Sequence, residues 1–388
     1  MSVGAQAATR AATQATRLLI LCMALWSATV EAAVALPAVN ARAWILYDPG
    51  SEQILAQHNA DQRLEPASLT KLMGAYLVFK ALHERRLDHR QQIEPSPNAA
   101  VPNGAAMHLQ AGKSVSVDEL MLGMLVVSAN DATLALAETL GGSEAGFVSQ
   151  MNQEAQRLGL ANTHFRNATG HSMPEHYSSA HDLARLATAI VRSYPEEYSL
   201  FSRHEIRYGD LSQLNRNRLL WLDATVDGMK TGQTEAAGWC LVASALREPR
   251  RLIVVILGAS SDNERFADAQ RLLNYGYQAF DTVRLHQERQ ALKRLPVWLG
   301  KAPSVEIGLR EDLILSVPAG RAASLTERLR YHDALRAPLR AGDPVGSLLV
   351  SLDGQQLGEY PVQVLHDVPA AGWLGRSWDR LRLWLKNF

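Results

Sequence analysis

The chain is poor in cysteine and has no excess charge of either sign. Cys22 and Cys240 are its only two cysteines, and Cys22 lies in an apolar segment near the N-terminus. Removal of that segment would leave a single thiol, so we expect no disulfide in the mature protein. The 39 lysine and arginine residues balance the 39 aspartate and glutamate residues, and no long basic run occurs, so no nucleic-acid partner is expected. Metal-ligand spacing and a phosphate-binding loop are also absent, and we expect neither a metal nor a cofactor.

The N-terminus lacks an apolar run long enough to cross a membrane. Residues 18–26 are apolar, but Glu31 ends the segment early. Arg10 and Arg17 precede the run, and the small residues Ala32 and Ala33 follow it, which is the pattern of a secretory signal. We therefore expect residues 1–33 to be a signal peptide and the rest to be exported to the periplasm. The alternative is an uncleaved membrane helix.

The body of the chain has a composition of 47% hydrophobic and 20% charged residues and is long enough for two or three domains. Two β-type runs around a Pro-Gly turn predict a hairpin over residues 43–57. Apolar residues at helical spacing predict helices over 69–82, 117–127, 131–140, 143–158, 180–191 and 263–280. Further β-rich runs at 239–246 and 252–258 predict an α/β (α+β) domain over residues 38–283, in which an antiparallel sheet carries a helical subdomain.

The C-terminal part has a different pattern. Short alternating runs separated by turn signals predict a small all-β domain over residues 284–368. Residues 369–388 form an amphipathic segment. Its apolar side carries Leu374, Trp378, Leu381, Trp384, Leu385 and Phe388. Tryptophan beside arginine and lysine at a chain end favours attachment to a membrane surface, and packing on the all-β domain is the alternative.

The candidate catalytic residues begin with P-A-S-L-T-K at residues 66–71. Ser68 and Lys71 would share one face of a helix, where a neutral lysine amine can take the proton of the serine hydroxyl. The Ser68 amide would lie near the positive end of that helix and could bind an oxyanion. By itself, such a pair is more often an N-cap serine followed by a solvated lysine.

Two further fragments change the interpretation of this pair. Ser128-x-Asn130 and K-T-G at residues 230–232 follow in the order found in serine β-lactamases and penicillin-binding proteins. Ser96 and Ser261 also begin an S-x-N match. Ser96 lies in the loop 95–112, which is rich in proline, asparagine and glycine and is predicted at the surface, and Ser261 precedes a helix that it can cap. Capping of the next helix is likewise the alternative for Asn130 and Asp131.

With these fragments, the sequence resembles the serine D-alanyl-D-alanine carboxypeptidases, which are low-molecular-mass penicillin-binding proteins. The likeness spans residues 39–388 and includes E-P-A-S-L-T-K at 65–71, G-L-A-N-T-H-F at 159–165 and V-D-G-M-K-T-G-Q-T at 226–234. It implies a penicillin-binding, β-lactamase-like transpeptidase domain, followed by a β-rich domain and a membrane-anchoring helix at the outer face of the inner membrane.

The resemblance also implies an acyl-transfer reaction. Ser68 would attack the carbonyl between two D-alanines of a peptidoglycan stem peptide and form an acyl-enzyme, with Lys71 as the base. Ser128 would relay a proton to the leaving nitrogen. The same site would be acylated by β-lactam antibiotics, which would act as inhibitors, and the enzyme would serve cell wall biogenesis and cell shape.

The substrate-binding residues implied by the resemblance lie in the second and third fragments and beyond. They are Asn130, Lys230, Thr231, Gly232, Gln233 and Arg265. Asn130 would hold the substrate amide and Lys71, and Lys230 and Thr231 would meet the terminal carboxylate. The backbone amides of Ser68 and Gln233 would form the oxyanion hole.

One departure from the family pattern, and the absence of a feature that class A β-lactamases use, bear on the expected activity. Gln233 replaces the histidine common after K-T-G, so an altered rate or pH response is expected. A water-activating glutamate in a Glu-x-x-Leu-Asn pattern is absent from residues 162–176, where Glu175 is expected at the surface, so slow acylation by penicillins is favoured over rapid hydrolysis. The alternatives are a catalytically weak wall-binding scaffold, or a D,D-endopeptidase or β-lactamase using the same site.

Overall fold

The computed structural model describes residues 34–101, 104–332 and 335–386, so the predicted signal peptide at 1–33 lies outside the described residues. Within these described residues, the helices and strands belong to the unit Leu36–Phe388. A five-stranded antiparallel sheet organises the first domain, in the order β2-β1-β9-β8-β7. Its strands are β1 (Ala41–Asp48), β2 (Gln53–His58), β7 (Val226–Thr234), β8 (Gly238–Arg247) and β9 (Arg250–Ala259).

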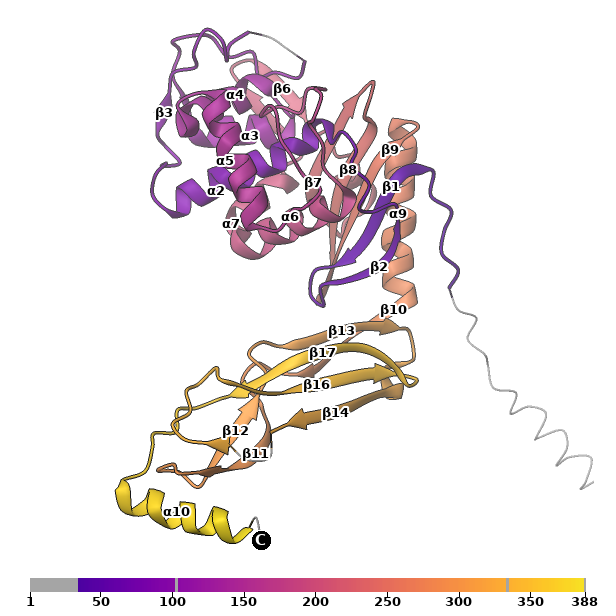
Figure 1. Ribbon diagram of the computed structural model, residues 1–388. Helices are drawn as coiled ribbons and strands as arrows, with labels where there is room; N and C mark the ends of the chain where they lie inside the picture. Colours follow the sequence, from indigo (N-terminus) through magenta and orange to yellow (C-terminus); the bar gives the residue numbers. More distant parts are fainter. Residues whose placement is uncertain (1–33, 102–103, 333–334, 387–388) are drawn as a thin grey trace, which may run out of the picture. The chain divides into compact units, whose positions relative to one another are not determined.

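Helices cover both faces of this sheet (Figure 1). One face packs on a helical group: α2 (Lys71–His83), α3 (Val117–Val126), α4 (Asn130–Gly141), α5 (Glu144–Arg157) and α6 (Ala180–Ser193). The other face packs on α9 (Asp262–Ala279). Short elements complete the domain: η1 (Ala67–Thr70), α7 (Pro195–Tyr198), η2 (Ser199–Ser202), α8 (Leu219–Leu222), and the pairs β3 (Gln92–Ile93) with β4 (Val115–Ser116) and β5 (Glu205–Tyr208) with β6 (Leu211–Leu214).

The central strands are apolar on both sides because each side meets a helical layer. Along β9, Ile253 and Val255 belong to the core shared with the helical group, whereas Val254 and Ile256 belong to the core shared with α9. Successive side chains of a strand point to opposite faces, so one run of apolar residues serves both cores. The predicted α/β architecture is therefore confirmed.

The loop before α3 is not purely a surface loop, contrary to the expectation for residues 95–112. Met107 and Leu109 are buried, and their backbone amides donate to Asp131 Oδ1 and Oδ2, both at 3.0 Å. The N-cap of α4 is Ala129, with no side-chain capping bond. The alternative that Asn130 or Asp131 caps this helix is thus wrong, because the Asp131 carboxylate is used to hold the distant loop.

The second domain is all-β, as predicted. Its six-stranded sheet has the order β14-β16-β17-β12-β11-β15, and β10 pairs with β13. The strands are β10 (Phe280–His286), β11 (Ala291–Trp298), β12 (Ser304–Gly308), β13 (Leu313–Pro318), β14 (Leu325–Tyr331), β15 (Leu335–Arg336), β16 (Pro344–Leu352) and β17 (Gln355–Val364), with the 3₁₀ turn η3 (Ala322–Ser324) before β14. The strand β17 runs continuously through Pro361. The pairing of β17 with β12 involves Gln363 and Val364 only, so the missing amide of Pro361 interrupts no bond there.

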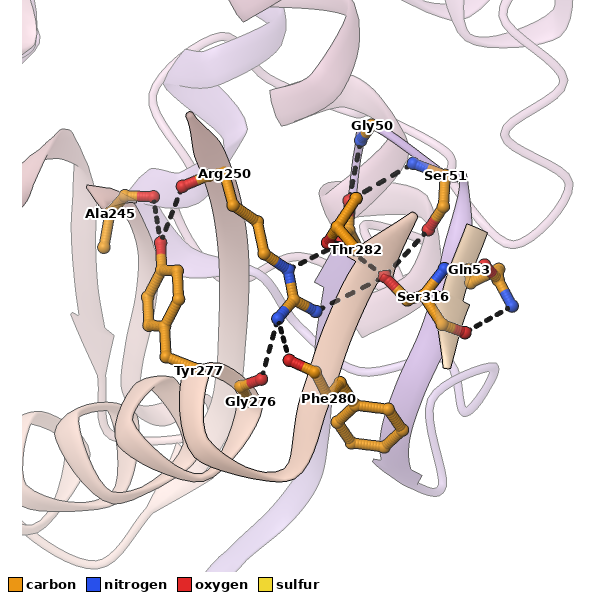
Figure 2. Close-up of polar contacts among 11 residues, drawn as sticks. Gly50, Ser51, Gln53, Ala245, Arg250, Gly276, Tyr277, Phe280, Thr282 and Ser316 are labelled. Carbon is orange, nitrogen blue, oxygen red and sulfur yellow. Dashed lines mark hydrogen bonds and ion pairs between the residues drawn. The ribbon is translucent and has the colours of Figure 1, made fainter. Parts of the chain in front are cut away.

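A buried charged cluster joins the two domains (Figure 2). The Asp48 carboxylate, at the end of β1, accepts from Arg250 Nε at 2.9 Å and from Ser316 Oγ of β13 at 2.6 Å. Arg250 also donates to the carbonyl oxygen of Phe280 at 2.7 Å. In addition, Gln53 Oε1 accepts from the Ser316 amide at 2.6 Å, and Gln53 Nε2 donates to the Ser316 carbonyl oxygen at 3.2 Å. Asp48 and Arg250 are almost fully buried, so this ion pair is shielded from solvent.

The C-terminal segment forms α10 (Trp373–Lys386), and Trp373, Leu374 and Trp378 are exposed. Asp379 accepts from the backbone amide of Leu299 in the all-β domain at 2.8 Å. The remaining apolar positions predicted for this helix, Leu381, Trp384, Leu385 and Phe388, have side chains outside those that the structure describes. Among the described residues, no helix combines the length and the apolar content needed to span a bilayer.

Candidate active site

The serine of the first fragment lies in a tight turn at the head of α2. Ser68 is the second residue of η1, and the Leu69 amide donates to the Pro66 carbonyl at 3.1 Å. Ala67 has a φ of 49°, a conformation that non-glycine residues adopt rarely. The turn thus places Ser68, which is partly exposed, on the wall of a cleft, and the buried helix α2 holds it from below.

Lys71 is completely buried and does not behave as a solvated lysine. Its Nζ lies 3.1 Å from Ser68 Oγ, 2.7 Å from Asn130 Oδ1 and 2.7 Å from the Thr169 carbonyl oxygen. Burial, together with the charge of Arg216, lowers the pKa of Lys71 to about 7. A substantial fraction of the amine is therefore neutral near pH 7 and can accept a proton from Ser68.

The second fragment lies opposite, between α3 and α4. Ser128 has a φ of 64°, and its Oγ is buried with no hydrogen-bond partner among the described residues. A buried hydroxyl without a partner is rare in folded proteins and needs an explanation. Asn130 begins α4 and brings its side chain to Lys71 on one side and to His171 Nε2, at 3.4 Å, on the other.

The third fragment lies on β7, an edge strand of the sheet. Gly232 passes so close to η1 that a Cβ there would lie 2.9 Å from the Ser68 amide nitrogen, so the absence of a side chain is required. Thr231 lines the cleft, but Lys230 is buried behind it and donates to the Thr231 carbonyl oxygen at 2.9 Å. Burial and the neighbouring charge of Lys71 hold the pKa of Lys230 well below its ordinary value.

Two arginines lie at the same cleft. Arg265 of α9 is buried and donates to the carbonyl oxygens of Gly232 at 2.9 Å and Cys240 at 3.1 Å, so it ties β7 to β8. Arg216 is exposed, and its Nε donates to the Val127 carbonyl oxygen at 2.8 Å. The sequence did not indicate Arg216, because it lies in an irregular N-R-N-R stretch and approaches the site only through the fold.

The residues predicted from the three fragments thus come together around one cleft of about 320 Å³. Lys71 and Lys230 lie just behind its wall. Its lining is Ser68, Gly104, Ala105, Ser128, Asn130, Thr169, Gly170, His171, Arg216, Thr231, Gly232, Gln233, Thr234, Trp239 and Arg265. The two other S-x-N matches have local roles: Ser261 is the N-cap of α9, and Ser96 Oγ accepts from the Ala99 amide at 3.0 Å.

Comparison with known proteins gives the same assignment over most of the chain. A family model described as D-alanyl-D-alanine carboxypeptidase matches residues 29–261. A second, described as the C-terminal domain of penicillin-binding protein 5, matches residues 280–370. The D-alanyl-D-alanine carboxypeptidase DacC of Escherichia coli (strain K12) is 38% identical over 359 residues, which cover 90% of this chain and 89% of that protein.

Solved structures resemble this one in both domains. Penicillin-binding protein 5 from Haemophilus influenzae superposes with a TM-score of 0.84 at 36% identity, covering 87% of this chain and 99% of that one. Penicillin-binding protein D2 from Listeria monocytogenes, in the ampicillin-bound form, covers 62% of this chain and 98% of its own, at 30% identity and a TM-score of 0.57. The chain therefore belongs to the D-alanyl-D-alanine carboxypeptidase family of serine peptidases.

Proposed function

We propose that this protein removes the terminal D-alanine from peptidoglycan stem peptides through an acyl-enzyme on Ser68. The observation that carries the proposal is the 3.1 Å contact between Lys71 Nζ and Ser68 Oγ, made by a buried amine whose pKa is about 7. The neutral amine takes the Ser68 proton while Oγ attacks the carbonyl carbon between the two D-alanines. Collapse of the tetrahedral intermediate breaks the C–N bond, and water later hydrolyses the ester.

The leaving nitrogen needs a proton, and Ser128 is placed to deliver it. Its hydroxyl is buried at the cleft and has no partner among the described residues, so it is available to a substrate. Asn130 accepts from Lys71 through Oδ1 and lines the cleft, so we propose that its side chain holds both Lys71 and the substrate amide. In this role, Ser128 and Asn130 act on the substrate from the side opposite β7.

A cation-crowded pocket suits the terminal carboxylate of the substrate. Lys71, Arg216 and Arg265 each disfavour the charged form of Lys230, and an incoming carboxylate would offset that repulsion. Thr231 offers a hydroxyl in the cleft, and Arg216 offers an exposed guanidinium. We propose that Arg216 shares the carboxylate with Thr231, while Lys230 and Arg265 act from behind the strand.

The oxyanion hole is proposed to consist of the backbone amides of Ser68 and Gln233. The close approach of Gly232 on β7 to the Ser68 amide supports this proposal. Because only the Gln233 backbone is needed, the replacement of histidine by glutamine should alter the rate or pH response without abolishing the reaction. Glu175 is exposed, which fits slow acylation by penicillins better than rapid hydrolysis.

We also propose the location and division of the protein. Residues 1–33 would direct export, 38–283 would form the catalytic domain, 284–368 the β-rich domain, and 369–388 the membrane attachment. The exposed Trp373, Leu374 and Trp378 support a peripheral position at the outer face of the inner membrane.

Release of D-alanine from a pentapeptide ending in D-alanyl-D-alanine tests the proposed reaction. The protein without residues 1–33 should release it, and Ser68→Ala should not. Equal release by Ser68→Ala would overturn the mechanism. A folded wild-type protein that releases nothing and takes up no penicillin would favour a wall-binding scaffold.

A further inference from the structure

His176 lies beneath the nucleophile turn and outside the cleft lining. It is 2% exposed and is surrounded by the loop 165–176 and by η1. Its Nε2 lies 2.8 Å from Thr70 Oγ1, and its Nδ1 lies 3.0 Å from the Arg166 amide nitrogen. The ring therefore bridges the loop and the turn that carries Ser68.

The direction of each hydrogen bond in this group is determined by chemistry. The Arg166 amide can only donate, so His176 Nδ1 accepts and carries no proton. The Ala67 carbonyl oxygen, 2.8 Å from Thr70 Oγ1, can only accept, so the Thr70 hydroxyl donates to it. Thr70 Oγ1 must then accept from the Nε2–H of His176. Burial, with a smaller effect of His164, lowers the pKa of His176 to about 4, in agreement with a neutral ring.

The end of this chain of bonds is the peptide group between Ala67 and Ser68. This peptide is trans, so its carbonyl and its N–H point in opposite directions. A Cβ on Gly170 would lie 2.0 Å from the Ala67 carbonyl oxygen and 2.8 Å from the Ser68 nitrogen, so the Gly170 loop packs against the whole peptide group. A Cβ on Gly232 would lie 2.9 Å from the Ser68 nitrogen. The peptide group is thus held by Thr70 at its carbonyl oxygen and approached by β7 near its nitrogen.

We infer that His176 is a positioning residue for the oxyanion hole, acting through Thr70 and the Ala67 carbonyl to aim the Ser68 N–H into the cleft. This inference rests on the proposed function, because it needs the Ser68 amide to bind the oxyanion. His176 itself touches neither the cleft nor the substrate. Its effect is confined to the orientation of the peptide plane between Ala67 and Ser68. That orientation also requires Ala67 to keep an uncommon positive φ.

Two pairs of variants distinguish the loss of a hydrogen bond from a change in packing. Thr70→Val keeps the shape of the side chain but removes the hydroxyl, and Thr70→Ser keeps the hydroxyl. His176→Asn retains an acceptor near the Arg166 amide but is too short to reach Thr70, and His176→Gln can reach it. Thr188→Val is the matched control, because Thr188 is also a buried threonine that donates to a carbonyl oxygen at 2.8 Å, but in α6.

Acylation by a fluorescent penicillin at several concentrations gives the maximal rate and the apparent binding constant separately. Thr70→Val and His176→Asn should lower the maximal rate about tenfold or more, with the binding constant changed less than about threefold, because an oxyanion donor is worth about 10²–10³-fold. Thr70→Ser, His176→Gln and Thr188→Val should remain within about threefold of wild type.

Each result has a definite meaning. Wild-type rates in folded Thr70→Val or His176→Asn would overturn the inference, as would a loss shared equally by Thr188→Val. If one of Thr70→Val and His176→Asn does not fold, the test uses the other. That variant must then have a lower maximal acylation rate than its own conservative counterpart, Thr70→Ser or His176→Gln. A wild-type protein that is not acylated would refute the proposed function instead, so the two failures are distinguishable.

Discussion

The charge of Arg216 lowers the pKa of Lys71, although the two residues come from distant parts of the sequence. Burial of Lys71 is the larger cause, and the nearby Asp131 opposes both effects. The amine that contacts Ser68 is thus kept partly neutral by its surroundings. Because Arg216 also lines the cleft, where we propose that it binds the substrate carboxylate, one residue would link the basicity of Lys71 to substrate binding.

The pH dependence of acylation should follow the neutral fraction of Lys71. Lys71 is an effective base only above its pKa of about 7, so the acylation rate should rise with pH from 5 to 8. At pH 5 it should be about a hundredfold below its plateau, because the neutral fraction falls tenfold per pH unit below the pKa. Stopped-flow labelling with a fluorescent penicillin measures this. Lys71→Arg should be inactive throughout, whereas Lys113→Gln, at an exposed loop position, should match wild type. A rate independent of pH would exclude Lys71 as the base.

Arg216→Gln should move this pH profile. Loss of the positive charge raises the pKa of Lys71, so the acidic limb should shift to higher pH, with acylation at pH 7 roughly two- to tenfold slower. The KM for a D-alanyl-D-alanine peptide should also rise if Arg216 binds its carboxylate. Arg218→Gln is the control, since Arg218 is equally exposed but pairs with Asp262 and does not line the cleft. An unshifted profile for Arg216→Gln, or an equal shift for Arg218→Gln, would contradict this role.

The cluster between the two domains should contribute substantially to stability. Asp48→Asn would leave the buried Arg250 without its ion partner and should lower the free energy of unfolding by about 3–5 kcal/mol. Glu84→Gln removes an exposed pair with Arg86 and should cost less than about 1 kcal/mol. Urea denaturation followed by tryptophan fluorescence compares the two. If Asp48→Asn lowers the free energy of unfolding as little as Glu84→Gln does, the two domains are held together by their other contacts.

The C-terminal helix should attach the protein to lipid. Trp373→Ser/Trp378→Ser should weaken binding to anionic vesicles at least about tenfold, because both exposed indoles would lie at the membrane interface. Deletion of residues 373–388 should abolish the binding. Leu357→Ser, at an exposed apolar position in β17, should have no effect. Unchanged vesicle sedimentation of the deleted protein would rule out this attachment.

Much of the fold follows from local patterns in the sequence. The hairpin, the main helices and the strands β8 and β9 have strong periodicity or flanking turns, and the fragments around Ser68, Ser128 and Lys230 identify the cleft by their order. By contrast, β14 was not predicted, because its L-T-E-R-L-R-Y pattern is largely exposed and charged. Such a strand is recognised only by its pairing with β16.

The parts of the site that sequence reasoning missed are those that depend on long-range contacts. Asp131 looked like a helix cap, but it holds the backbone of a loop more than twenty residues earlier. Thr169 contributes only a carbonyl oxygen to Lys71, which no residue type encodes. Arg216 and His176 belong to irregular segments without periodicity, and their roles depend on which buried groups the fold brings beside them.

The central claim concerns one atom, the hydroxyl oxygen of Ser68. Mass spectrometry of the protein after incubation with benzylpenicillin, followed by peptide mapping, tests it most directly. We expect a single covalent adduct on the peptide that contains Ser68, and no adduct in Ser68→Ala. An adduct on another residue, or one that persists in folded Ser68→Ala, would contradict it.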